Sequence, residues 1–134
     1  MRQYLLEVIT PERVVYRGEV EMVIARGTEG DLGVLAGHEP LLTALEIGVV
    51  QVRGAQPERL AVNGGFLTVR PEGVSILTDT AERSAEIDVM RARAAKERAE
   101  ARLRARDDEV DVTRAESALK RALARLGAAV ETHS

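Results

Sequence analysis

The chain has 134 residues, a formal net charge of −3 at pH 7, 45% hydrophobic and 31% charged residues, and no cysteine. This composition suits one soluble folded domain, or a small domain with an appendage, rather than a disordered chain. The charge argues against nucleic-acid binding by the whole chain, and the lack of cysteine excludes disulfides and thiolate metal sites and fits a reducing compartment.

No apolar run approaches the roughly 18 residues that a membrane-spanning helix needs. The first residues, Met1 to Glu7, reach a carboxylate too early for a secretory signal peptide. We therefore expect a cytoplasmic protein that meets a membrane only through its partners.

The first 83 residues consist of short strand-like runs separated by turn residues. Residues 3–10 alternate with a period of two, since Tyr4, Leu6 and Val8 fall on one face. The other predicted strands are 14–16, 20–25, 32–35, 41–45, 47–52, 60–62, 66–69 and 74–77, and the separators include 17–19, 54–58 and 63–65. Turn signals at this spacing predict an antiparallel β-sandwich or flattened barrel over residues 1–83. Because aromatic residues make up only 2%, its core should be built from Val, Leu, Ile and Ala.

Residues 84–134 have a helical pattern instead. Asp88 is a good N-cap for a helix of residues 88 to about 106, and a second helix should run from 112 to about 126 and end at Gly127. The acidic segment 107–111 (DDEVD) forms the turn between them. The apolar stripes are Ala92, Ala95, Ala99 and Leu103 on the first helix and Ala115, Leu119, Ala122 and Leu126 on the second. We expect an antiparallel hairpin, stabilised only weakly by its alanine seam and therefore able to move.

No motif for catalysis is present. The sequence has no phosphate-binding P-loop, no Ser, His and Asp arrangement and no metal-ligand spacing, so we predict no catalytic residue and no metal site. His38 lies in a turn, where we expect a structural role, and His133 lies in the C-terminal tail. The glycine pairs 30/33 and 64/65 are typical of strand turns rather than phosphate loops.

The arginines of the hairpin form the most informative pattern. Arg91 and Arg98 are seven residues apart on one face of the first helix, and Arg121 and Arg125 are four apart on the second. Folding of the hairpin could bring all four towards Glu82 and create an anion site with forked donors for phosphate. Spacing alone favours the alternative, an ordinary solvated surface. The excess of basic residues along both helices fits either docking on an acidic protein surface or a plain soluble helix face.

The sequence resembles the epsilon subunit of bacterial F-type ATP synthase along nearly its whole length. The resemblance rests on residues 8–11 (VITP), 30–38 (GDLGVLAGH), 63–67 (NGGFL), 81–83 (AER), 87–92 (IDVMRA) and 119–122 (LKRA). Ala36 departs from the family, which commonly has proline at this position.

The resemblance implies a non-catalytic rotor subunit that couples proton flow to ATP synthesis. The β-sandwich would bind the gamma subunit and the c-ring, and the membrane would be reached only through the Fo sector, at the cytoplasmic face of the cell. The hairpin would inhibit ATP hydrolysis by extending into the alpha/beta hexamer, where its second helix would meet an acidic segment of beta.

The resemblance also implies that the folded hairpin binds ATP as a regulatory ligand. The matching residues are Glu82, Ile87, Asp88, Arg91, Ala92, Arg98, Arg121 and Arg125. This match reverses the preference for a solvated arginine surface. Two other functions remain open: a free-standing ATP sensor, and a β-sandwich adaptor whose basic helices bind an acidic partner.

Overall fold

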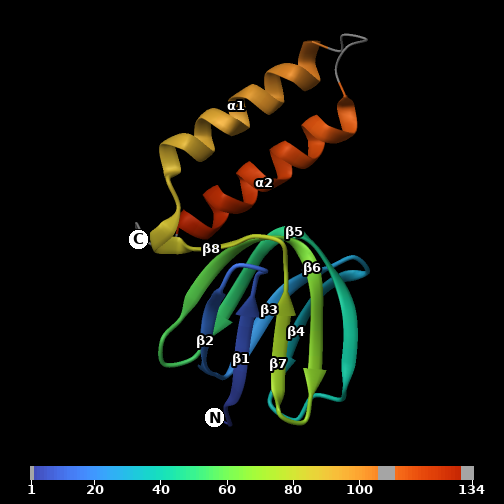
Figure 1. Ribbon diagram of the computed structural model, residues 1–134, viewed down its shortest axis with the longest axis vertical. Coiled ribbons are helices and arrows are strands. Elements are labelled where there is room, and N and C mark those ends of the chain that lie inside the picture. Colours follow the sequence, from blue (N-terminus) through green and yellow to red (C-terminus); the bar gives the residue numbers. More distant parts are fainter. Residues whose placement is uncertain (1, 106–110, 131–134) are drawn as a thin grey trace.

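The computed structural model describes residues 2–105 and 111–130, which form a β-sandwich followed by a two-helix hairpin (Figure 1). The predicted fold class is confirmed. The strands are β1 (Tyr4–Ile9), β2 (Val14–Val20), β3 (Met22–Gly27), β4 (Gly30–Leu35), β5 (Leu41–Arg53), β6 (Glu58–Arg70), β7 (Gly73–Leu77) and β8 (Ala81–Arg83). A 3-10 turn, η1 (Ser84–Glu86), leads into the helices α1 (Val89–Ala105) and α2 (Val112–Val130).

The strands follow the order β2-β1-β7-β6-β5-β3-β4, and β8 pairs with β6. All described pairings are antiparallel except that of β1 with β7, which runs parallel from Leu5 opposite Gly73 to Ile9 opposite Leu77. The chain passes through β2 to β6 between β1 and β7, and a connection of that length permits a parallel pair. The sheet is therefore mixed rather than purely antiparallel.

The strands β5 and β6 are longer than predicted, with 13 residues each. Residues 63–65 were predicted to separate two strands, and this was wrong. They lie within β6, where Gly64 and Gly65 have φ of 76° and 115°. A Cβ atom on Gly65 would overlap the carbonyl oxygen of Leu77, so only glycine fits the close approach. Residues 17–19, also predicted as a turn, lie within β2. Gly64 and Gly65 bend β6, so that the first half of this strand pairs with β8 and the second half with β7.

The sandwich core is mainly aliphatic, as predicted. Leu6, Val8, Leu60, Leu67 and Ile76 are fully buried in it. Of the aromatic residues, only Tyr16 is fully part of this core, with Tyr4 partly buried against it.

The hairpin begins where the sequence indicated. The Asp88 carboxylate accepts a hydrogen bond from the backbone N–H of Arg91 at 3.0 Å, which confirms Asp88 as the N-cap of α1. Asp111 accepts from the N–H of Arg114 in the same way, at 3.0 Å, and caps α2. The predicted seam is confirmed at Ala92, Ala99, Ala115 and Ala122, which are at most 2% exposed. Its other members are half-buried: Ala95, Leu103, Leu119 and Leu126. The rest of the predicted acidic turn, the predicted end of the first helix at Arg106, and His133 lie outside the described residues.

The predicted end of α2 at Gly127 is wrong, because the helix continues to Val130. Its last turns carry Ala124, Ala128 and Ala129, which pack on Ala61 of β6 and on Ile87. A Cβ on Gly127 would lie 3.2 Å from a methyl carbon of Val49. The glycine therefore permits close approach to β5, and this tertiary contact carries the helix past a residue that commonly ends helices. Figure 1 shows that α2 meets the end of the sandwich, while α1 lies on the far side of α2.

Candidate functional site

The segment between β8 and α1 forms one wall of a pocket at the joint of sandwich and hairpin. The pocket has a volume of about 420 Å³ and is lined by Thr80, Glu82, Glu86, Asp88, Arg91, Ala92 and Arg125. Five of these seven residues belong to the site predicted from the sequence. The pocket thus combines residues of the last strand, the connecting turn and both helices, and its size is within the range of small-molecule sites.

Glu82 and Arg125 join the sandwich to α2 across this pocket. The Nε atom of Arg125 donates to a carboxylate oxygen of Glu82 at 2.5 Å, and each side chain is about one-third exposed (36% and 32%). A partly solvated ion pair of this kind contributes about 0.2–1 kcal/mol. It therefore biases the hairpin towards the docked position without locking it there.

Arg91 is the second guanidinium of the pocket. Its backbone N–H is bound by Asp88, but its exposed guanidinium makes no hydrogen bond or ion pair within residues 2–105 and 111–130. The Asp88 carboxylate binds the backbone N–H of Arg91 instead, and no side-chain pair of Asp88 with Arg91 occurs among the described contacts. A guanidinium at the first turn of a helix, beside the positive end of the helix dipole, is suited to an anionic ligand.

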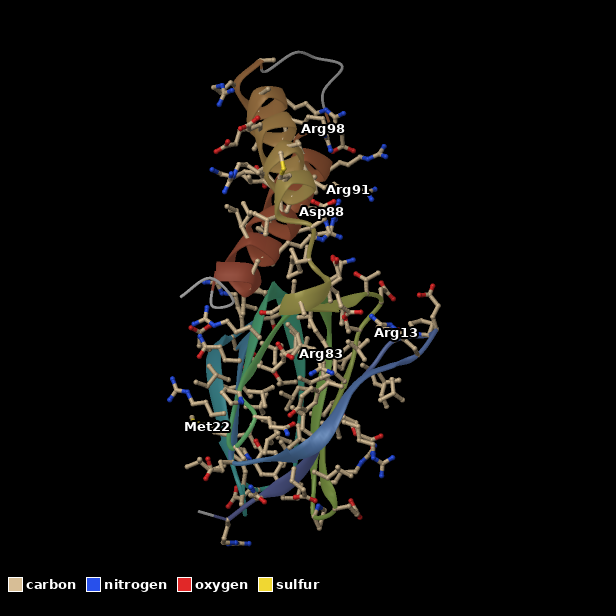
Figure 2. The ribbon with its side chains drawn as sticks, turned by 90° about the vertical axis from the view of Figure 1, so that its left-hand side faces the viewer. Arg13, Met22, Arg83, Asp88, Arg91 and Arg98 are labelled. Atoms are coloured by element: carbon tan, nitrogen blue, oxygen red, sulfur yellow. The ribbon has the colours of Figure 1, made fainter. Side chains whose placement is uncertain are left out.

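The other predicted site residues have different positions. Ile87 is buried in the small apolar cluster under the hairpin, and Ala92 is buried in the helix seam, so both position the backbone of the pocket. Arg121 lies beside Arg125 on a smaller cavity that Glu82 also lines. Arg98 is exposed further along α1 and lines none of the described pockets (Figure 2).

Two residues of the pocket, Thr80 and Glu86, were missed by sequence reasoning. Glu86 closes the 3-10 turn, since its carboxylate accepts from the N–H of Arg83 at 2.9 Å, and it also pairs with Arg13 at 2.7 Å. These two contacts, the first more than the second, hold the pKa of Glu86 below its usual value. Arg13 and Glu86 are 73 residues apart. The available signal was the position of Glu86 three residues after Arg83, typical of a capping carboxylate.

The outer face of the sandwich carries a separate apolar area. Leu42, Phe66 and Leu77 are 68%, 54% and 51% exposed. Phe66 and Leu77 line a shallow pocket of about 700 Å³ near the bend of β6. Large apolar side chains gathered on one face are typical of a protein–protein contact.

Within the described residues there is no helix long and apolar enough to cross a membrane. The same residues contain no group of three or more His, Asp or Glu side chains placed to hold a metal ion.

The fold and the pocket define a class of protein: a β-sandwich with a docked helical hairpin and a charged pocket at their joint. The family model of the ATP synthase Delta/Epsilon chain beta-sandwich domain matches residues 3–84, and that of the long alpha-helix domain matches residues 85–129. The chain therefore belongs to the ATP synthase delta/epsilon chain family.

Individual relatives agree. The chain is 60% identical over 103 residues to the "ATP synthase epsilon chain" of Moorella thermoacetica (75% of this chain and 77% of that protein). It is 49% identical over 107 residues to the protein of the same name from Syntrophomonas wolfei (78% of each). Among solved structures, a chain of the Euglena gracilis mitochondrial ATP synthase OSCP/F1/c-ring assembly superposes with a TM-score of 0.81 at 30% identity, covering 96% of this chain and 81% of that one. A chain of the Tetrahymena thermophila central stalk/c-ring, at 14% identity and a TM-score of 0.58, supports the fold alone (99% and 98% covered).

Proposed function

We propose that the chain is a non-catalytic central-stalk subunit of a bacterial, proton-translocating F-type ATP synthase, located at the cytoplasmic face of the cell membrane. The names of its relatives and the mitochondrial F1/c-ring assembly that contains a similar chain support this role. In this role the sandwich binds the gamma subunit and the c-ring. The hairpin restrains ATP hydrolysis when it leaves the sandwich for the alpha/beta hexamer, and ATP holds it back.

The observation that carries the regulatory part is the pocket shared by sandwich, connecting turn and both helices. A ligand that contacts Arg91 on α1 and Arg125 on α2 binds only while the hairpin is folded and docked. Such a ligand shifts the equilibrium towards the docked state by its differential affinity for that state. The guanidinium of Arg91, which has no partner among the described residues, supports a phosphate group as the recognised part.

ATP binding is tested by calorimetric titration of the whole chain. Arg91→Ala removes the guanidinium that has no described partner, and we expect a loss of ATP affinity of at least about tenfold, since a charge-assisted hydrogen bond contributes about 1.5–3 kcal/mol. Arg93→Ala is the matched control, because Arg93 is exposed on the same helix and lines no described pocket. If Arg91→Ala and the parent chain bind ATP with equal affinity, the proposal that this pocket binds ATP is wrong.

The inhibitory role is tested in the assembled enzyme. Truncation after Arg83 removes both helices and leaves the strands of the sandwich intact. We expect ATP hydrolysis to rise while proton-coupled synthesis persists. Unchanged hydrolysis would exclude inhibition by the hairpin and leave the stalk role standing.

The exposed apolar area of Leu42, Phe66 and Leu77 supports docking of the sandwich on another protein chain. Phe66→Glu should weaken co-purification with gamma, because it places a charge in a contact that excludes water. Leu35→Glu, at a side chain that is 48% exposed on β4, is the control for a surface charge elsewhere. A free-standing sensor would co-purify with neither gamma nor the alpha/beta hexamer.

A further inference from the structure

The pocket at the joint contains more negative than positive side chains. Three carboxylates line it, those of Glu82, Glu86 and Asp88, against the two guanidiniums of Arg91 and Arg125. A pocket with this balance should repel a polyphosphate unless its carboxylates are compensated. The way in which each carboxylate is compensated therefore decides whether an anion binds.

Two of the three are compensated by groups of the joint itself. Glu82 is paired with Arg125 at 2.5 Å, and Asp88 accepts from the first turn of α1 at 3.0 Å. Glu86 differs, because its cationic partner comes from the other end of the chain. The Nη2 atom of Arg13 lies 2.7 Å from a carboxylate oxygen of Glu86.

The turn between β1 and β2 holds Arg13 in place for this contact. The backbone N–H of Thr10 donates to the carbonyl of Arg13 at 2.9 Å, and the N–H of Arg13 donates to the Thr10 hydroxyl at 3.3 Å. Thr10 is itself buried, at 8% exposure. Arg13 is therefore presented from a closed turn of the sandwich, while Glu86 is fixed from the other side by the N–H of Arg83. Figure 2 shows Arg13 at the edge of the sandwich, below Asp88 and Arg91 at the base of the hairpin.

We propose that Arg13 is a positioning residue of the nucleotide pocket, which neutralises Glu86 and so makes this wall of the pocket acceptable to a polyphosphate. The inference rests on the proposed function of the pocket and adds an element to it. The first turn of the sandwich becomes part of a site otherwise built from β8, the connecting turn and the hairpin. Arg13 acts through Glu86 and needs no contact with the ligand.

The test is a mutant cycle on the whole chain, with ATP affinity measured by calorimetry. Arg13→Ala should weaken ATP binding roughly two- to fivefold, the range of a partly exposed charge interaction. Glu86→Gln keeps an oxygen acceptor for the N–H of Arg83 and removes the charge, so it should bind ATP at least as well as the parent. The double variant Arg13→Ala/Glu86→Gln should recover the affinity that Arg13→Ala loses.

Arg17→Ala is the matched control. Arg17 is exposed on β2 and pairs with Glu7 at 3.6 Å, so its loss changes the net charge equally but away from the pocket. Repeating the titrations with ADP adds a readout that a purely structural role would not move. The effect of Arg13→Ala should be smaller for this less charged ligand.

Each outcome decides the matter. The proposal is overturned if Arg13→Ala leaves the ATP affinity unchanged. It is also overturned if the double variant binds ATP as weakly as Arg13→Ala does, or if Glu86→Gln binds ATP more weakly than the parent chain. The last two results would make the pair a structural contact. If the parent chain binds no ATP, both the ATP-binding function and the role of Arg13 are overturned. If Arg91→Ala loses ATP binding but Arg13→Ala has no effect, only the role of Arg13 is overturned.

Discussion

The hydroxyl of Ser84 donates a buried hydrogen bond of 2.6 Å to the carbonyl oxygen of Ala128, 44 residues further along the chain. Ser84 begins the turn that leaves the sandwich, and Ala128 lies in the last turn of α2, whose carbonyls have no partner within the helix. One residue earlier, the carbonyl of Gly127 accepts from Arg59 of β6 at 3.3 Å. The end of α2 is thus capped by the sandwich and its exit turn, so helix capping and hairpin docking are the same set of contacts.

Ser84→Ala should loosen the docked hairpin. The change leaves a buried carbonyl without its donor, which costs about 1–3 kcal/mol. We expect faster amide hydrogen exchange in the last turn of α2, with exchange in the sandwich core unchanged. Ser117→Ala, on the same helix, is the control, since no hydrogen bond of its hydroxyl occurs among the described residues. Equal protection in both variants would mean that the Ser84–Ala128 hydrogen bond does not hold the hairpin in its docked position.

Gly127→Leu should displace the hairpin from the sheet. A leucine there would extend beyond a Cβ already 3.2 Å from Val49, and overpacking of this kind costs about 1–3 kcal/mol. Because the chain has no cysteine, single cysteines introduced at the exposed positions of Glu72 and Arg102 can carry spin labels, and we expect their distance distribution to broaden. Ala101→Leu adds the same side chain at an exposed position of α1 and should leave the distribution narrow. A narrow distribution in both would contradict the close-approach role of Gly127.

Gly65→Ala should destabilise the sandwich far more than Gly30→Ala. Both glycines have positive φ, 115° and 124°, so both variants carry backbone strain of about 1 kcal/mol or more. At Gly30 the added carbon meets no atom within 4 Å, whereas at Gly65 it overlaps the carbonyl of Leu77. Chemical denaturation should show about 1 kcal/mol lost at Gly30 and several at Gly65. Similar losses at both positions would mean that strain alone matters at the bend of β6.

Glu86 should make the folded joint sensitive to acid. Because its pKa is lower in the folded chain than in the unfolded chain, the ionised carboxylate contributes stability above the unfolded pKa. That contribution is lost as pH falls through the folded pKa. We therefore expect the stability of the parent chain to exceed that of Glu86→Gln near neutral pH. The difference should shrink as pH falls below the usual glutamate pKa of about 4.3 and vanish only below the lower folded pKa. A difference that persisted at low pH would point to packing instead of charge.

Much of the architecture was predictable from local patterns. The alternation of apolar residues in β1, the alanine stripes of the helices and the N-cap at Asp88 depend on neighbours a few residues away, and these predictions were confirmed. The resemblance to the epsilon family was carried by short motifs and was confirmed by the comparisons. These features are local, so the order of residues is sufficient to reveal them.

The failures at Gly65 and Gly127 share one physical cause. Both glycines were predicted to end their elements, but tertiary contacts with Leu77 and Val49 use the missing side chains for close approach and carry strand and helix onward. Local propensity is a weak preference that packing overrides.

In the candidate site, too, some features follow from local sequence and others only from tertiary contacts. The sequence by itself determined which residue types surround the joint, because Glu82, Asp88, Arg91 and Ala92 are close in the chain and Arg125 lies at helical spacing from Arg121. Only the tertiary structure decided that Arg125 meets Glu82, that Arg98 lies away from the pocket, and that Arg13 reaches Glu86 from 73 residues away. Charge pairing acts through space, and the distances that set its strength exist only once the sandwich and hairpin have docked.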